Sequence, residues 1–375
     1  MKQKLNRPGV LLLIPHLGGG GAEQVTALLA QNLPSTRYDL HLGLITQRRH
    51  TAYSSLSMHA HIHCLGARRI RTSALLLLAL VWRLRPRLIL STMAHLNFLV
   101  LLLRPLFPPR TRVLVRQNGT VSAMLAQDGT PRLTRLLYRN LYARADRVIC
   151  QTDAMAADLR SCIELGPGHL SVLPNPIDLD AMRASASAQQ SNWSGPGPHL
   201  LAVGRLSHEK GFDLLLHALY ALRAQFPTID LAIAGAGPEE HALRQLVRLL
   251  GLEHRVRLLG SVASPADFFS GATLFVLPSR HEGMPNAMLE AAAAGLPIVA
   301  TAAGGGVASL LRNQAGVWLA HESSEGALAL AISAALRTLP AGARFPHPWV
   351  EQFHLDRAIP AYQDLIDATL QTAAR

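Results

Sequence analysis

The sequence predicts an α/β protein made of two doubly wound parallel-sheet domains in tandem, and three observations support this. The chain has 375 residues, roughly twice the length of one ordinary domain. Each half alternates short apolar runs, typical of buried strands, with longer segments of helical spacing. Residues 181–199 are rich in Ser, Ala, Gln, Gly and Pro, which is typical of a linker. Hydrophobic residues make up 49% of the chain and charged residues 16%, which excludes a disordered chain and a coiled coil.

In the first half, the predicted strands are short apolar runs followed by helical segments, which is the pattern of repeated βα units. The predicted strands are residues 10–14, 40–45, 61–65, 88–91, 112–116 and 147–150. The predicted helices between them include residues 22–33, 75–84 and 133–143. The apolar stretch 88–103 contains His95 and Asn97 and is shorter than a membrane span needs, so we expect no transmembrane helix. The short apolar run after the N-terminus ends in glycines, so we also expect no signal peptide.

The same rhythm restarts after the linker. The predicted strands are residues 200–203, 231–234, 256–259, 274–277, 298–300 and 317–319, and the predicted helices are residues 212–225, 239–250, 286–294 and 327–336. A final helical segment, residues 350–372, lies outside the second sheet. We therefore expect a first domain at 1–180, a linker at 181–199, a second domain at 200–345 and a C-terminal segment at 346–375 that packs back on the first domain.

The charge of the chain is concentrated in its first half. Residues 1–180 hold 22 basic and 9 acidic side chains, a net of +13, whereas residues 181–375 hold 14 and 15, a net of −1. This favours an anionic membrane surface as a partner of the first domain, with ordinary solvated surfaces as the alternative. Nucleic acid is disfavoured because aromatic residues are only 5% and no recognition motif is present. The three cysteines form no paired framework, which favours reduced thiols and a cytosolic location.

Three loops that each follow a predicted strand carry chemistry. Glycines 18–21, followed by Ala22 and Glu23, open the first helix, where backbone N–H groups and the helix dipole favour an anion. The second loop runs from Gly204 to Gly211 and places Arg205 and Lys210 where ligands of open α/β sheets bind. The chain has 33 arginines and only three lysines, so the single interior lysine, Lys210, indicates a site that needs a compact charge, such as a phosphate site.

The third loop, residues 279–290, is the most specific. Gly283 and Pro285 keep its start out of a helix, so Glu282 is predicted on the loop and Glu290 about one turn into the next helix. A single ligand would then meet a carboxylate for hydroxyls, a positive helix end and a second carboxylate for a ribose. This arrangement suits a nucleotide sugar.

Together, the paired glutamates, the Arg205/Lys210 loop, the glycine-rich first loop and the glycines at 301–306 resemble the retaining GT-B glycosyltransferases of glycosyltransferase family 4. The resemblance implies two Rossmann-like domains that face each other across a cleft, with the nucleotide sugar on the second and the acceptor on the first. One departure is Ala302-Ala303-Gly304, where many relatives have Asp before the late glycines.

The resemblance also implies roles for individual residues. Arg205 and Lys210 would hold the diphosphate, Glu282 would contact the donor sugar, and Glu290 would accept from the ribose hydroxyls. His95 is the candidate for a first-domain histidine near the donor sugar, with His16 and His281 as weaker candidates and with residues 116–118 as competitors for the same space. The other expected donor-binding residues are Gly20, Gly21, Gly204, Gly237, Val262, Gly283, Met284, Pro285 and Asn286.

These residues predict an enzyme that needs no metal, because the positive charge at the leaving phosphate comes from Arg205, Lys210 and the helix that starts at Asn286. The expected reaction is transfer of a sugar from a UDP-sugar to a lipid-linked glycan or lipopolysaccharide-type acceptor, by a peripheral protein on the inner face of the cell membrane. The main alternative is a non-catalytic nucleotide-sugar-binding module of the same fold. A dehydrogenase using Gly235 and Gly237 is disfavoured, because the third glycine and the ribose-binding acid are missing.

Overall fold

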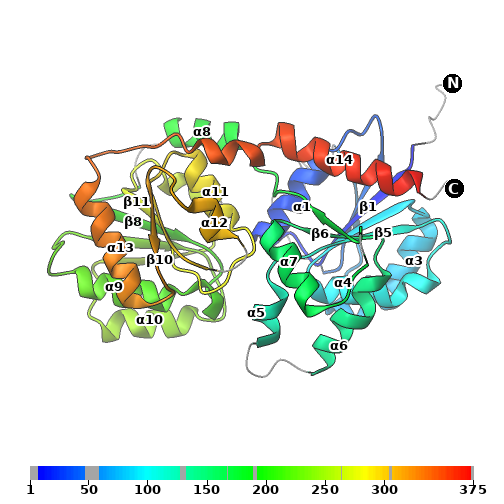
Figure 1. The fold of residues 1–375 in the computed structure, drawn as a ribbon, viewed down its shortest axis with the longest axis horizontal. Coiled ribbons are helices and arrows are strands. Elements are labelled where there is room, and N and C mark those ends of the chain that lie inside the picture. Colours follow the sequence, from blue (N-terminus) through cyan, green and yellow to red (C-terminus); the bar gives the residue numbers. More distant parts are fainter. Residues whose placement is uncertain are drawn as a thin grey trace. The chain divides into compact units, whose positions relative to one another are not determined.

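The computed structural model describes residues 7–46, 59–126, 132–166, 168–188, 192–262, 264–303 and 306–372. The chain forms two compact units (Figure 1). The first unit contains residues 1–176 and 355–375, and the second contains residues 177–354. Each unit is built around one parallel sheet, which confirms the predicted α/β fold class.

In the first unit, seven parallel strands have the order β3-β2-β1-β4-β5-β6-β7. Their bounds are β1 Gly9–Ile14, β2 Asp39–Leu44, β3 His61–Cys64, β4 Leu88–Thr92, β5 Arg112–Arg116, β6 Arg147–Cys150 and β7 Leu170–Val172. The helices are α1 Gly21–Asn32, α3 Ala74–Leu84, α4 Ala94–Leu103, α5 Val121–Ala126, α6 Arg132–Leu141, α7 Asp153–Cys162 and α14 Leu355–Gln371, with the short helices η1 Ile70–Thr72, η2 Arg104–Leu106 and η3 Tyr142–Arg144.

Both faces of this sheet are covered, which explains why its strands read as continuous apolar runs. Along β1, Leu11 and Leu13 belong to the core beneath α3, α4, α6 and α7. Val10, Leu12 and Ile14 point to the opposite face and join a core with α1 and α14, which lie side by side (Figure 1).

In the second unit, six parallel strands have the order β10-β9-β8-β11-β12-β13. Their bounds are β8 His199–Val203, β9 Asp230–Ala234, β10 Val256–Gly260, β11 Leu274–Leu277, β12 Ile298–Thr301 and β13 Val317–Ala320. The helices are α8 Leu179–Ala188, α9 Phe212–Leu222, α10 Glu240–Leu249, α11 Asn286–Ala293, α12 Val307–Leu311 and α13 Glu325–Thr338, with η4 His208–Lys210, η5 Pro265–Phe268 and η6 Pro348–Phe353. Helices α9, α10 and α13 pack on one core, and α8, α11, α12 and η6 pack on the other.

The unit boundaries differ from the predicted ones. The segment predicted as a linker, residues 181–199, instead contains most of α8, which belongs to the second unit and packs against α11 and η5. Leu179, at the start of α8, is fully buried and Met182 packs on the same core, so this Ser- and Ala-rich helix buries one apolar edge. The predicted C-terminal segment, 346–375, is also divided: η6 stays with the second unit and α14 belongs to the first.

No helix in the described part of the chain is both long and apolar enough to cross a bilayer.

Candidate active site

The strand order of the second unit places two of the predicted loops next to each other. β8 and β11 are neighbours at the point where the strand order reverses, and parallel strands end at the same edge of a sheet. The loop at 204–211 follows β8 and the loop at 278–285 follows β11. In open α/β sheets this reversal point is where ligands bind, so the two loops frame a candidate site.

Lys210 and Glu282 meet between these loops. The Lys210 Nζ donates a hydrogen bond to Glu282 Oε1 at 2.6 Å, and Ser279 Oγ donates to the same oxygen at 2.6 Å. Glu282 is only 8% exposed. A buried carboxylate needs such partners, because an unpaired buried charge is costly. Within the described residues no hydrogen bond reaches the other carboxylate oxygen, Oε2.

A second ion pair holds the two loops together. Arg280 binds both carboxylate oxygens of Asp213, on α9, at 2.7 and 2.6 Å, and it also donates to the carbonyl of His208. The Arg280 backbone N–H donates to the Glu209 carbonyl at 2.8 Å. Burial by itself would raise the pKa of Asp213, but hydrogen bonding and charge attraction from Arg280 outweigh it and leave that pKa below its usual value. The pair thus fixes the loop that carries Glu282 against the loop that carries Lys210.

Helix α11 starts where the sequence predicts. Pro285 is its N-cap in an extended conformation, and the helix runs from Asn286. Gly283, Met284, Pro285 and Asn286 are all buried. Glu290 lies one turn into the helix and is 4% exposed. The loop and first turn are therefore packed into the protein, and they bring the buried Glu282 and Glu290 into consecutive parts of one segment.

Arg205 is exposed at the carboxyl end of β8, directly after Gly204. A Cβ on Gly204 would lie 3.6 Å from the Cδ of Lys210, so the stem of Lys210 runs past this glycine. Gly237 and Val262, the other donor-binding candidates of this unit, lie on the loops that follow β9 and β10, respectively. A Cβ on Gly237 would lie 2.2 Å from the Leu206 carbonyl oxygen, so this glycine lets the β9 loop pack directly on the β8 loop.

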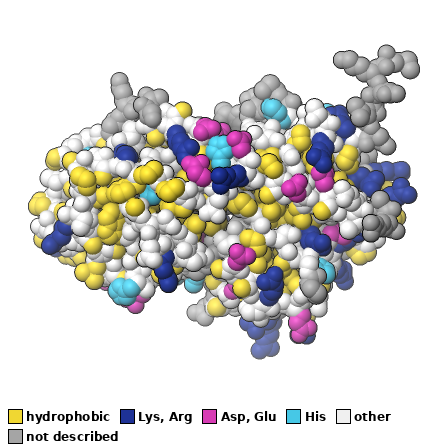
Figure 2. Space-filling model, turned by 45° about the horizontal axis from the view of Figure 1, so that its top comes forward, with side chains coloured by type: hydrophobic (Ala, Val, Ile, Leu, Met, Phe, Trp, Pro, Cys, Tyr) yellow, Lys and Arg dark blue, Asp and Glu magenta, His cyan; other side chains and the backbone are white. Residues whose placement is uncertain are grey.

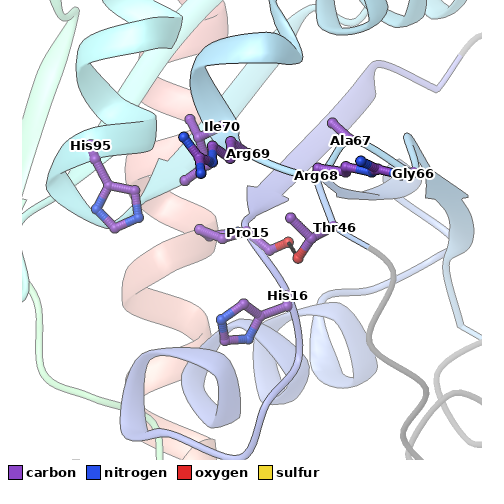
Figure 3. Close-up of a pocket in the computed structure, with 9 residues that line it drawn as sticks. All are labelled: Pro15, His16, Thr46, Gly66, Ala67, Arg68, Arg69, Ile70 and His95. Atoms are coloured by element: carbon purple, nitrogen blue, oxygen red, sulfur yellow. Dashed lines mark hydrogen bonds between the residues drawn. The ribbon is translucent and has the colours of Figure 1, made fainter. Parts of the chain in front are cut away.

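In the first unit, His95 stands in the first turn of α4, directly after β4. It lines a pocket with His16 (Figure 3). His95 is exposed by its accessible surface, and partial desolvation by surrounding protein atoms lowers the pKa of its imidazole below the usual value. Met93, the N-cap of α4, has φ +76°, a conformation that non-glycine residues rarely adopt. Such strain is concentrated at functional sites, which fits a role for the turn that presents His95.

The glycine-rich loop opens α1 as expected. Gly20 is the N-cap and Gly21 is the first helical residue. The Glu23 carboxylate folds back over this helix start, where a Cβ on Gly20 would lie 2.5 Å from its Oε2. Glu23 also pairs with His16 Nδ1 at 3.5 Å.

Residues 116–118, the alternatives to His95 near the donor sugar, bond to other parts of the first unit. Arg116 is buried and bonds to Asn118, Asn175 and Tyr362, and Gln117 contacts the buried Tyr138 and Tyr142. None of residues 116–118 is among the pocket-lining residues. The third histidine, His281, is exposed on the β11 loop.

Sequence reasoning missed several residues of this region. Ser279 carried no signal beyond its place beside Glu282. The Arg280–Asp213 pair joins positions 67 apart, and only the adjacency of β8 and β11 reveals it. Arg68 and Arg69 line the first-unit pocket. The sequence did not distinguish them, because many other arginines lie in the same segment.

Two models of glycosyltransferase families match this chain. The model of Glycosyltransferase Family 4 matches residues 19–181, and that of Glycosyl transferases group 1 matches residues 197–338. An N-acetylgalactosamine-N,N'-diacetylbacillosaminyl-diphospho-undecaprenol 4-alpha-N-acetylgalactosaminyltransferase of Campylobacter jejuni is 28% identical over 302 residues, 77% of this chain and 80% of that protein. An uncharacterized glycosyltransferase of Methanocaldococcus jannaschii is 28% identical over 170 residues, 44% of this chain and only 42% of that protein.

Solved structures show the same fold. Sucrose-phosphate synthase from Thermosynechococcus elongatus superposes with a TM-score of 0.82 at 21% identity, covering 98% of this chain and 100% of that one. Anabaena HepE in complex with UDP-glucose has a TM-score of 0.76 at 18% identity, covering 96% and 100%. The two family models together span both units, and the architecture is that of two-domain, Rossmann-like GT-B proteins. The chain therefore belongs to glycosyltransferase family 4.

Proposed function

We propose that this protein is a retaining glycosyltransferase that moves a sugar from a UDP-sugar to a lipid-linked glycan or lipopolysaccharide-type acceptor at the cytoplasmic face of the membrane. The observation that carries the proposal is the Lys210–Glu282 pair, which lies where the strand order of the second sheet reverses. One loop supplies a cation and the other a carboxylate, which are the groups that a sugar diphosphate needs.

The chemistry follows from the charges. As the bond between C1 of the sugar and the phosphate oxygen breaks, negative charge develops on the leaving nucleotide diphosphate. An ammonium group has three donors, so Lys210 can keep its bond to Glu282 and still donate to a phosphate oxygen. Arg205 is exposed on the same loop and adds a second positive charge. Cations placed in advance around a leaving group stabilise the transition state more than the ground state.

The remaining roles rest on the family resemblance and the positions in the fold. Glu282 Oε2 would accept from a hydroxyl of the donor sugar, and Glu290 from the ribose. The N-terminus of α11, with residues 283–286, would face the sugar and phosphates. Gly204, Gly237 and Val262 would border the nucleotide, and Gly20 and Gly21 would approach the diphosphate. His95 would act near the donor sugar.

The donor and acceptor classes are supported by relatives. Anabaena HepE was crystallised with UDP-glucose, and the Campylobacter relative is named for a diphospho-undecaprenol substrate. We propose a UDP-sugar and a lipid-linked acceptor on this basis. We also propose that transfer needs no divalent cation, since Arg205 and Lys210 supply the positive charge. Full activity in the presence of EDTA is the expected result.

The surface of α6 supports docking on an anionic membrane. Its exposed side combines Leu133 and Leu136, 60% and 53% exposed, with Arg132, Arg135 and Arg139. The helix contains no carboxylate, and Tyr138 and Leu141 anchor its other side. Leucines beside arginines are typical of helices that lie in the membrane interface. Basic side chains also appear over the first unit in the view of Figure 2, toward its right and lower margins.

A thermal-shift screen against UDP-, GDP- and ADP-sugars tests the proposed donor. We expect a UDP-sugar to raise the melting temperature of the wild type and to have little effect on Lys210→Ala. No shift with any nucleotide sugar, or equal shifts in both proteins, would contradict the assigned donor site. Release of UDP in the presence of acceptor then separates an enzyme from a non-catalytic binding module.

A further inference from the structure

The first unit contains a pocket of about 530 Å³ at the carboxyl edge of its sheet. Its lining comes from the segments that follow β1, β2, β3 and β4, which are neighbours in the order β3-β2-β1-β4. The pocket therefore spans the point where the strand order reverses, between β1 and β4, which is the usual ligand position in such sheets. The lining residues are Pro15, His16, Thr46, Gly66, Ala67, Arg68, Arg69, Ile70 and His95.

The charge of this lining is one-sided. It contains two arginines and two histidines, and no carboxylate. Arg68 and Arg69 are both exposed, and their guanidinium groups form no hydrogen bond or ion pair with the described residues. Glu23, the carboxylate that approaches the pocket, is paired with His16 at 3.5 Å. The positive charge of the arginines is thus left available to a ligand.

The arrangement of the side chains favours Arg69 as the main contact. In Figure 3, the Arg69 side chain extends from the loop after β3 toward the side of the pocket that carries His95, whereas Arg68 extends along the loop toward Gly66. The loop itself is fixed: the Ala67 N–H donates to the Ile45 carbonyl at 2.9 Å, and Thr72 Oγ1 donates to the Arg69 carbonyl at 2.8 Å. A guanidinium held on a fixed backbone can bind two phosphate oxygens at once.

We propose that this pocket holds the phosphate of a phosphorylated acceptor, with Arg69 as its principal ligand, Arg68 at the rim and the His95 ring beside it. This inference rests on the proposed glycosyltransferase function and names the acceptor class for it. The phosphate belongs either to a lipid-linked diphosphate or to a soluble sugar phosphate, and both share the same recognition chemistry. A phosphate would form ion pairs with these guanidinium groups, whereas a neutral acceptor would form none.

Binding is tested first, without any requirement for turnover. Inorganic pyrophosphate is titrated while the ring NMR signals of His16 and His95, assigned with His16→Gln and His95→Gln variants, are followed. We expect both signals to shift in the wild type and the apparent affinity to fall roughly tenfold to a hundredfold in Arg69→Ala. Arg69→Lys, which keeps the charge but loses the two-point contact, should be intermediate.

The matched control is Arg71→Ala. Arg71 is an exposed arginine in η1, two residues away, and it does not line the pocket. The Arg71→Ala change removes the same charge from the same segment as Arg69→Ala. If Arg69 acted only through long-range electrostatics, both variants would therefore lose pyrophosphate affinity equally. Equal effects of Arg69→Ala and Arg71→Ala, or histidine signals that do not respond to pyrophosphate, would overturn the proposed pocket.

Transfer is tested next, with three acceptors that carry one sugar as a lipid-linked diphosphate, as a soluble phosphate or as a neutral glycoside. We expect phosphorylated acceptors to be used and the neutral glycoside to be poor, and Arg69→Ala to raise the acceptor KM while leaving the donor KM near its wild-type value. Preference between the first two identifies the source of the phosphate. Efficient use of the neutral glycoside, unaffected by Arg69→Ala, would contradict the inference. Absence of any donor turnover would instead count against the proposed function, and the pyrophosphate titration would still decide the pocket.

Discussion

At the scale of single residues, three histidines on strand β2 and the edge strand β3 couple the first unit to pH. His41 Nδ1 and His63 Nε2 share a hydrogen bond at 3.1 Å, and Arg83 approaches His63 at 3.3 Å. Burial, with the nearby His41, Arg83 and His61, lowers the pKa of His63 to about 4. Burial also lowers the pKa of His41. A hydrogen bond between two imidazoles needs one unprotonated nitrogen, so protonation of both rings breaks it.

The pH dependence of stability follows. The pKa of His63 is lower in the folded protein than the ordinary value of 6.5, so between pH 6.5 and 4 the unfolded chain binds more protons. Stability contributed by neutral His63 is therefore present above pH 6.5 and is lost as the pH falls through this window. We expect His63→Gln to reduce the pH dependence of the unfolding free energy by roughly 1–3 kcal/mol over this range, measured by urea unfolding. An identical pH profile in the variant would disprove the assignment.

Some site residues were predictable one by one and others were not. Lys210 was singled out because the chain otherwise uses arginine, and the structure places its ammonium on the predicted Glu282. The shared partner Ser279 and the Arg280–Asp213 pair depend on how β8 and β11 pair, which no local pattern reveals. In the sequence, Arg68 and Arg69 look like the other arginines of their segment, and only the structure shows that they line the pocket.

At the scale of elements, close approach of two loops requires particular glycines. Gly235, directly after β9, has φ +147°, and a Cβ there would lie 1.8 Å from the Gly204 carbonyl oxygen. The Gly204 N–H in turn donates to the Ala234 carbonyl at 3.0 Å. The glycine thus lets the β8 and β9 ends pack backbone to backbone, which supports the loop that carries Arg205 and Lys210.

Gly235→Ala should therefore destabilise the second unit by about 2–4 kcal/mol, because it combines backbone strain with a clash. Thermal unfolding measures this. The control is Gly326→Ala, near the start of α13, where a Cβ would meet nothing within 4 Å. That change should raise stability by about 0.4–1 kcal/mol. Comparable stabilities for the two variants would argue against the close approach.

Elements with a clear pattern were predicted well, and elements without one were missed. The buried strands coincide with the predicted runs to within about two residues, because strands covered on both faces are continuously apolar. Helix α8 was missed because Ala and Ser make up most of it and only Leu179 and Met182 supply its apolar edge. Strand β7 and helix α7 were also missed, since three residues make a weak strand signal and α7 has a mixed composition.

At the scale of the whole molecule, the charge is divided between the two halves of the chain. The net of +13 in residues 1–180 and −1 in residues 181–375 makes only the first half attractive to anionic lipid. The exposed leucines and arginines of α6 add a local contact to this long-range attraction.

Binding to vesicles tests this division. Replacing Arg132, Arg135 and Arg139 by Gln should weaken binding to vesicles of anionic phospholipid by roughly a hundredfold at low salt, at about 1 kcal/mol for each charge. The same number of charges removed from the second unit, at the exposed Arg223, Arg248 and Arg312, should have little effect. Wild-type binding should also fall as salt is added. If binding did not depend on salt, or if both triple variants lost affinity equally, the arginines of α6 would be ordinary solvated surface residues and not a membrane contact.

The central claim is that Lys210, with Arg205 and Glu282, holds the diphosphate of an activated sugar. The most direct measurement is the rate of UDP release from the best donor, compared between the wild type, Lys210→Ala and a control, Arg312→Ala, at an exposed arginine that follows α12. We predict a loss of about a hundredfold or more for Lys210→Ala and a near-normal rate for the control. A Lys210→Ala protein that is folded and releases UDP at the wild-type rate would contradict the claim.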